Sequence, residues 1–280
     1  MKEIVVISGK GGTGKTTVTA SLGATLKNCV LADCDVDAAD LYLLYKPQVK
    51  HDFKFWGMPK ANIIEDKCIK CGKCEQICRF DAIDNFKVDA TFCEGCKVCY
   101  NVCLENAIEI VDVISGHWYI SDTKYGPMVH ARLGTAEENS GKLVSLVKKA
   151  AREIAEREGY DYIIIDGPPG IGCPVIAALS GADIAIVVVE PTVAGLHDLD
   201  RVLKLAANFK TTIKVLINKW DISPEKAREI EDFCKDNNIQ IIGKIPFDGD
   251  VIKSITQGIP LVEYSKGSAS KILKDIAYLI

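Results

Sequence analysis

Residues 3–17, EIVVISGKGGTGKTT, place a short apolar run directly before a glycine-rich loop. Gly9–Thr16 fits the pattern G-x4-G-K-[S/T], between an expected strand at Glu3–Ser8 and an expected helix at Lys15–Leu26. Glycines let backbone N–H groups close around a phosphate, and the positive end of the helix dipole adds to that attraction. The stretch therefore predicts a nucleotide site where the first strand ends.

The same alternation of a short apolar run and a helical pattern continues along most of the chain. Further strands are expected at Cys29–Asp33, Tyr162–Asp166, Ile184–Val189, Ile213–Ile217 and Ile239–Ile245. Further helices are expected at Gly141–Glu158, Cys173–Ser180, Gly195–Asn208 and Pro224–Asn237. Apolar strands that alternate with helices are typical of a parallel sheet covered on both faces. The predicted fold class is therefore α/β, with a mostly parallel, doubly wound sheet.

Composition narrows the classes of function. The 280 residues carry a net charge of −4, which argues against a dedicated nucleic-acid surface. We expect no stable membrane insertion, because apolar runs are too short to span and the amphipathic Lys271–Ile280 is better explained as a final helix on the sheet. A strand that begins at Glu3 leaves no room for a signal peptide, so we expect a cytoplasmic protein.

Two residues of the glycine loop have direct chemical roles in nucleotide binding. Lys15 is expected to reach the β- and γ-phosphates, and the Thr16 hydroxyl is expected to bind Mg2+. The remaining loop residues are expected to surround the nucleotide: Gly9, Gly11, Gly12, Thr13, Gly14 and Thr17.

Eight of the twelve cysteines form two copies of C-x2-C-x2-C-x3-C. The first copy is Cys68, Cys71, Cys74 and Cys78, and the second is Cys93, Cys96, Cys99 and Cys103. They belong to an internal repeat, Cys68–Ile83 and Cys93–Ile108, whose halves are too small for separate cores and are expected to fold around metal. We therefore expect an insert at residues 58–110 within a discontinuous nucleotide domain, 1–57 and 111–280. Residues 111–140 are expected to form one or two short strands and a loop near the nucleotide.

The cysteine spacing resembles that of bacterial two-cluster ferredoxins. The resemblance implies a small inserted α+β domain that holds two 4Fe–4S clusters with crossed ligands. Cys68, Cys71, Cys74 and Cys103 would bind the first cluster, and Cys93, Cys96, Cys99 and Cys78 the second. Arg79 and Leu104 stand where ferredoxins usually have proline, which loosens the turn without removing a ligand. Two alternatives remain open: structural zinc, and clusters that serve only to stabilise the fold.

The glycine loop resembles the deviant Walker A loop of the MinD, ParA, Mrp and nitrogenase iron-protein superfamily, because Lys10 precedes the paired glycines. The resemblance implies a Mg-dependent ATPase that sandwiches ATP in a homodimer, or in a heterodimer with a similar chain. Lys10 would then reach across to the phosphates bound by the partner and neutralise charge during phosphoryl transfer.

Two acidic segments match the switch regions of the same superfamily. Asp35, in the D-x-D motif that begins at Asp33, would orient or activate the attacking water, and Asp33 would serve Mg2+ or structure. Asp166 ends an apolar strand and would hold Mg2+ through water, while the backbone N–H of Gly170 would sense the γ-phosphate.

Base recognition is expected from two loops that follow strands. Asn218 and Lys219 open the sequence N-K-x-D, and Pro246 and Asp248 lie in Ile-Pro-Phe-Asp. The superfamily uses an asparagine here for adenine, so the resemblance favours ATP. GTP remains the alternative, because Asp221 could accept hydrogen bonds from a guanine.

Three functions compete on these grounds. The first is ATP-gated electron transfer through the clusters to an unidentified redox partner, and we favour it because two closed cysteine quartets suit retained clusters. The second is an ATPase for iron–sulfur or metal-cofactor assembly, and the third is a MinD-like positioning or regulatory switch with redox-sensing clusters. Cys173 is expected to be buried at a helix start, with a switch-linked redox or cluster contact as the alternative; Cys29, Cys34 and Cys234 are expected to be structural.

Overall fold

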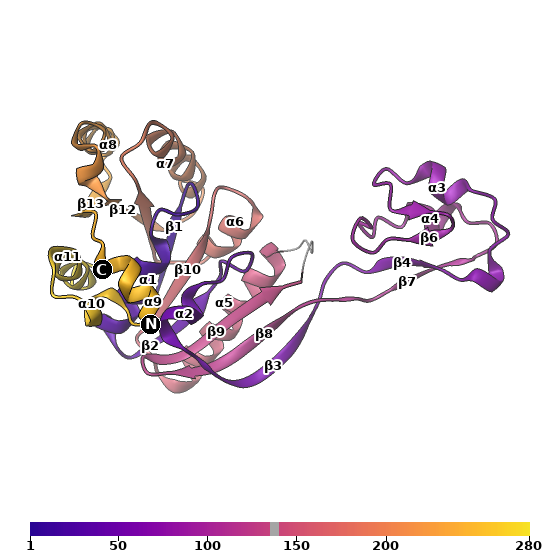
Figure 1. Cartoon of the computed structure of the whole chain (residues 1–280), viewed down its shortest axis with the longest axis horizontal. Helices are drawn as coiled ribbons and strands as arrows, with labels where there is room; N and C mark the ends of the chain where they lie inside the picture. Colours follow the sequence, from indigo (N-terminus) through magenta and orange to yellow (C-terminus); the bar gives the residue numbers. More distant parts are fainter. Residues whose placement is uncertain (135–139) are drawn as a thin grey trace. The chain divides into compact units, whose positions relative to one another are not determined.

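A parallel sheet organises most of the chain in the computed structural model, which describes residues 1–134 and 140–280 (Figure 1). Within these residues the largest sheet has nine strands in the order β13-β12-β11-β1-β10-β2-β9-β8-β3. The strands are β1 (Lys2–Ser8), β2 (Cys29–Asp33), β3 (Gln48–Trp56), β8 (Ile114–Thr123), β9 (Gly126–Leu133), β10 (Tyr162–Pro169), β11 (Ile184–Val189), β12 (Thr212–Asn218) and β13 (Gln240–Ile245). The pairs from β13 through β2 to β9 are parallel, which confirms the predicted fold class.

Two groups of helices contact the central strands β1 and β10. The helices that accompany the nine-stranded sheet are α1 (Lys15–Leu26), α2 (Leu41–Tyr45), α5 (Ser140–Glu158), α6 (Cys173–Leu179), α7 (Val193–Ala206), α8 (Pro224–Asp236), α9 (Asp250–Gln257), α10 (Leu261–Tyr264) and α11 (Ser268–Ala277), with a 3-10 turn at Trp220–Ile222. Helix α1 packs with α10 and α11, whereas α5 packs with α6. Ile4 and Val6 of β1 share a core cluster with α1 and α11, and Val5 and Ile7, which alternate with them along the strand, are equally buried. Since successive strand residues point to opposite faces, both faces of β1 are covered.

The C-terminal helix α11 has the packing expected from its sequence. Leu273 and Ile276 are buried in the core cluster that includes Leu22 of α1. Among the described residues, we find no helix that is both long and apolar enough to cross a membrane.

Strands β8 and β9 are longer than the sequence suggested. They contain ten and eight residues, where one or two short strands were expected. The expectation was wrong in length, because glycine does not end these strands: Gly116 lies inside β8 and Gly126 opens β9. The loop predicted near the nucleotide falls in part on residues 135–139, outside the described residues.

The chain divides into two compact units. The first contains Met1–Asp52, Trp118–Arg132 and Ser140–Ile280, and the second contains Phe53–His117 and the segment that begins at Leu133. The expected insert, 58–110, lies inside the second unit. The unit is wider than this range because β3 and β8 continue into it on either side.

The second unit is built from two similar halves. Its elements are β4 (Lys60–Ile63), a 3-10 turn at Glu65–Lys67, α3 (Lys73–Ile77), β5 (Ile83–Asp84), β6 (Lys87–Val88), α4 (Val98–Val102) and β7 (Ile108–Val111). Strand β4 pairs with β7, and β5 pairs with β6, both antiparallel. Helices α3 and α4 begin at the same offset that separates Cys68 from Cys93.

Backbone conformation repeats at that offset as well. Left-handed residues occur at equivalent places in the two halves: Lys70 and Gly95, Gly72 and Lys97, and Asp81 and Asn106. Such conformations are uncommon for residues other than glycine, so their recurrence shows that both cysteine loops take the same path. The internal repeat is therefore structural as well as sequential.

Candidate functional site

The glycine loop opens a cavity in the first unit. The cavity measures about 400 Å³ and is lined by loop residues, acidic residues and an apolar group: Gly11, Gly12, Gly14, Lys15, Thr16, Thr17, Val18, Asp35, Ala38, Asp40, Pro169, Asn218, Lys219, Ile245, Pro246, Phe247, Asp248, Val251, Ile252, Ile255, Leu261 and Leu273. Gly12 and Gly14 have φ angles of 78° and 96°, which glycine adopts at little cost. Lys15 then starts α1, so the N-terminus of this helix lies at the cavity.

Lys15 and Asp35 meet at the wall of this cavity. Lys15 Nζ lies 3.7 Å from Asp35 Oδ2, and both residues are buried. Burial raises the pKa of Asp35, while the nearby Lys15 charge acts in the opposite direction. The structure thus brings together the lysine predicted to bind phosphate and the acid predicted to act on water.

Asp166 lies at the same end of the sheet and receives two hydroxyl hydrogen bonds. Thr16 Oγ1 donates to Asp166 Oδ2 at 2.7 Å, and Thr19 Oγ1 donates to Asp166 Oδ1 at 2.8 Å. Burial raises the pKa of Asp166 to about 6, against the lowering effect of Thr16 and Lys15. The two predicted Mg2+ ligands are therefore adjacent, and a hydroxyl with a carboxylate is the hard oxygen set that Mg2+ prefers. Sequence reasoning missed Thr19, although it lies one helical turn after Lys15.

Asp33 has a structural position. Its carboxylate accepts hydrogen bonds from the backbone N–H groups of Asp35 and Leu41, both at 3.2 Å. It therefore holds the turn that carries Asp35 away from β2. Of the two roles considered for Asp33, these contacts favour structure.

Lys10 lies beside Glu190, a residue that sequence reasoning did not select. Lys10 Nζ is 2.9 Å from Glu190 Oε2, and Lys219 Nζ is 2.5 Å from Glu190 Oε1. Burial alone would raise the pKa of Glu190, but the hydrogen bonds from Lys219 and Lys10 hold that pKa below its ordinary value. The acidic residue at the end of an apolar strand was the sequence signal that could have found it.

The expected base-binding residues line the cavity, but Asn218 is engaged with the loop. Asn218 Nδ2 donates to the carbonyl oxygen of Thr13 at 2.8 Å. Pro246 and Asp248 line the cavity beside apolar side chains. The guanine alternative requires Asp221, which accepts a hydrogen bond from the backbone N–H of Phe247 at 2.7 Å. Among the described residues that line the cavity, Asp221 is absent. The arrangement favours adenine.

Gly170 is placed after β10 with a φ of 90°. Its N–H donates to the carbonyl oxygen of Ser8 at 2.8 Å. Its predicted contact with a γ-phosphate would require this hydrogen bond to break.

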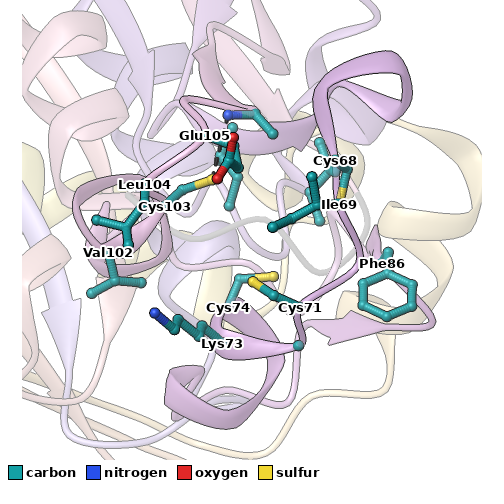
Figure 2. Close-up of a pocket in the computed structure, with 14 residues that line it drawn as sticks. Cys68, Ile69, Cys71, Lys73, Cys74, Phe86, Val102, Cys103, Leu104 and Glu105 are labelled. Carbon is teal, nitrogen blue, oxygen red and sulfur yellow. Dashed lines mark hydrogen bonds between the residues drawn. The ribbon is translucent and has the colours of Figure 1, made fainter.

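The cysteines of the second unit gather at two cavities. One cavity, of about 80 Å³, is lined by Cys68, Cys71, Cys74 and Cys103 with surrounding apolar residues. The other is lined by Cys78, Cys93, Cys96 and Cys99. Figure 2 shows the first cavity, where Cys103 approaches beside Val102 and Leu104 and the other three cysteines come from the first copy. Each cavity thus takes three cysteines from one copy and one from the other.

Backbone groups and apolar side chains surround these sulfur atoms. The N–H of Ala61 donates to Cys93 Sγ at 3.5 Å, and the N–H of Ala107 donates to Cys103 Sγ at 3.3 Å. All eight thiols are free of disulfides. Across residues 1–134 and 140–280, no three metal-binding side chains lie close enough to share a single metal ion.

The remaining cysteines divide by burial. Cys29, Cys34 and Cys234 are buried, as expected of structural residues. Cys173 begins α6 as predicted, but the prediction that it is buried was wrong, because it is exposed. The buried face of α6 is formed by residues further along the helix, Val175, Ala178 and Leu179.

Comparison with known proteins assigns the family. The model of the CobQ/CobB/MinD/ParA nucleotide binding domain matches residues 4–261. The chain belongs to this family and is a P-loop ATPase.

Relatives and solved structures agree with this assignment. An uncharacterised protein of Methanocaldococcus jannaschii is 35% identical over 283 residues, covering 98% of this chain and 94% of the relative. The septum site-determining protein MinD of Neisseria meningitidis is 28% identical, covering 98% and 89%. The structure of the MinD cell division protein of Aquifex aeolicus covers 100% of this chain and 96% of its own, at 24% identity and a TM-score of 0.59. MinD of Pyrococcus horikoshii complexed with Mg-ADP covers 99% and 94%, at 21% identity and a TM-score of 0.57. The two structures support the fold alone.

Proposed function

We propose that the protein is an ATP-driven dimeric switch whose inserted unit carries two 4Fe–4S clusters and transfers electrons under the control of nucleotide. The single observation that carries the proposal is the division of eight cysteines between two cavities, three from one copy and one from the other at each. Bound clusters would supply one-electron transfer.

The donor set fits clusters better than zinc. A 4Fe–4S cluster spreads four thiolates over four iron atoms, whereas a zinc site brings four ligands to one ion. The sulfur atoms surround cavities, and backbone N–H groups donate to two of them, a contact that tunes cluster potential. The buried core of this unit is also small: Ala61, Ile63, Ala82, Ile83, Cys93, Cys99 and Ile108. Such a core is expected to depend on its metal for stability.

The nucleotide site supplies the switch. Lys15 would bind the β- and γ-phosphates, Thr16 and Asp166 would hold Mg2+, and Asp35 would position the attacking water. The partner subunit's Lys10 would complete charge neutralisation when two copies, or two similar chains, enclose ATP. Helix α2 is the one element between Asp35 and β3 in this described part of the sequence. A movement of this switch therefore has a short covalent path into the inserted unit.

A MinD-like positioning or regulatory switch is the second candidate. It is favoured by the relatives named septum site-determining protein MinD, which match nearly the whole chain. Under this function the clusters would sense redox state. Cofactor assembly is less favoured, because Cys93 and Cys99 are buried, whereas cluster delivery requires accessible, exchangeable ligands.

The test is a redox titration of anaerobically purified protein without nucleotide, with Mg-ADP and with a non-hydrolysable ATP analogue. Electron transfer predicts about eight iron atoms per chain and a cluster potential or reduction rate that changes with nucleotide. Identical potentials and rates in all three states would exclude ATP-gated electron transfer. Iron that leaves the protein to an apo-acceptor during turnover would favour assembly instead. Anaerobic capture of proteins that bind only the ATP-locked state would then identify the redox partner.

The nucleotide is tested by competition. Unlabelled ATP should displace bound labelled ATP more effectively than GTP, because Asp221 is engaged by Phe247. Preferential displacement by GTP would overturn the adenine assignment.

A further inference from the structure

Glu190 lies in a hydrogen-bonded turn between β11 and α7. The N–H of Thr192 donates to the carbonyl oxygen of Glu190 at 2.8 Å, and the N–H of Gly195 donates to Thr192 Oγ1 at 2.9 Å. A Cβ atom at Gly195 would lie 2.2 Å from the carbonyl oxygen of Glu190, so only glycine fits there. The backbone of Glu190 is therefore held firmly, and its side chain extends from a defined position.

The carboxylate of Glu190 is shared between two lysines. One oxygen pairs with Lys10 at 2.9 Å and the other with Lys219 at 2.5 Å. Lys219 Nζ also approaches the carbonyl oxygen of Gly12 at 3.4 Å, which ties it to the glycine loop. The Glu190 side chain is 14% exposed and that of Lys10 is 35% exposed, so the Lys10 pair is partly shielded from water.

We propose that Glu190 is a positioning residue that holds Lys10 within its own subunit until ATP-dependent dimerisation releases it, with Lys219 as the counter-ion that makes the release possible. The inference rests on the proposed action of Lys10 across the dimer. While Lys10 remains paired with Glu190, its charge is engaged within its own subunit.

Lys219 lowers the free energy that is needed to separate Lys10 from Glu190. If Glu190 held Lys10 alone, departure of Lys10 would leave an uncompensated, largely buried carboxylate, which is strongly unfavourable. Because Lys219 keeps its contact with the second oxygen, departure costs only one partly exposed ion pair. Removing the Glu190 charge should therefore favour dimerisation, and removing the Lys219 charge should oppose it.

The experiment compares full-length Glu190→Gln and Lys219→Met. Dimerisation is measured by sedimentation velocity with a saturating non-hydrolysable ATP analogue, and ATP affinity is measured separately on dilute, monomeric protein. Glu190→Gln should tighten the dimer about fivefold, and Lys219→Met should weaken it by a similar factor. With excess protein and ATP, kcat of Glu190→Gln should stay within about twofold of wild type, since Lys10 is then already released.

A merely structural role predicts a different pattern. Loss of a structural contact would weaken the dimer in both variants, so shifts of the same sign would overturn the proposal, as would an unchanged dimer constant in Glu190→Gln. If Glu190→Gln does not fold, Glu190→Asp, which is too short to hold both lysines at once, should tighten the dimer to a smaller degree.

Lys10→Ala separates this inference from the proposed function. Full ATP turnover in Lys10→Ala would remove the role of Lys10 across the dimer. Turnover lost in Lys10→Ala, with wild-type dimerisation in Glu190→Gln, would remove only the holding role of Glu190.

Discussion

Three glycines of the phosphate loop differ in ways that predict a graded loss of stability. Gly11 lies outside the left-handed region and has open space around it, while Gly12 has a φ of 78° and open space. Gly14 has a φ of 96°, and a Cβ atom there would lie 2.5 Å from Asn218 Nδ2. Gly11→Ala therefore introduces neither backbone strain nor a clash, Gly12→Ala introduces strain alone, and Gly14→Ala introduces both.

The magnitudes follow from these differences. Alanine in the left-handed region costs about 1–2 kcal/mol, and loss of a hydrogen bond costs about 1 kcal/mol. Alanine also restricts the unfolded chain, which returns about 0.4–1 kcal/mol. Gly11→Ala should leave the free energy of unfolding unchanged or slightly higher, and Gly12→Ala should lower it by about 1 kcal/mol. Gly14→Ala should lower it by about 2 kcal/mol, since it also displaces Asn218 from Thr13.

The assay is urea denaturation of the nucleotide-free protein, followed by far-UV circular dichroism under anaerobic conditions. Asn218→Ala provides the matched background, because it removes the clash and the hydrogen bond but leaves the strain at Gly14. In that background the loss caused by Gly14→Ala should shrink by about 1 kcal/mol. Equal losses for Gly12→Ala and Gly14→Ala, or no coupling to Asn218, would refute the reasoning.

Three further predictions follow from single contacts. Thr19→Val should lower the free energy of unfolding by about 1.5–3 kcal/mol in urea denaturation, because it removes a hydrogen bond to the buried carboxylate of Asp166; a neutral effect would contradict the contact. Burial lowers the pKa of His130 to about 4, below its ordinary value of 6.5, so the unfolded state takes up the proton first as pH falls. The contribution of His130 to stability should therefore fall by about 1–2 kcal/mol between pH 7 and 5, opposite in sign to that of Asp166, whose pKa is raised. The stability of the wild type measured relative to His130→Gln in urea denaturation should fall by this amount, and a difference that does not change with pH would contradict the prediction. Cys103→Ser should remove the cluster signal of the first copy and Cys78→Ser that of the second, measured by iron content and electron paramagnetic resonance. Loss of the second copy's signal in Cys103→Ser and of the first copy's in Cys78→Ser would exclude crossed ligation.

Much of the nucleotide unit could be predicted because its determinants are local. The bounds of β2, β11 and α1 match the predicted ranges, since each combines an apolar or helical pattern with a clear terminator. Strand β3 was not predicted. It lies at the edge of the sheet with seven exposed residues in succession, so it lacks the apolar pattern that marks a buried strand.

The sequence alone determined the phosphate loop, the cysteine repeat and the parallel sheet, because each depends on spacing between near neighbours along the chain. Tertiary structure alone decided which distant side chains meet. Thr19 became a partner of Asp166, and Glu190 became the shared counter-ion of Lys10 and Lys219. These contacts join residues far apart in sequence at the carboxyl ends of parallel strands, where periodicity predicts burial but does not say which charges will face one another.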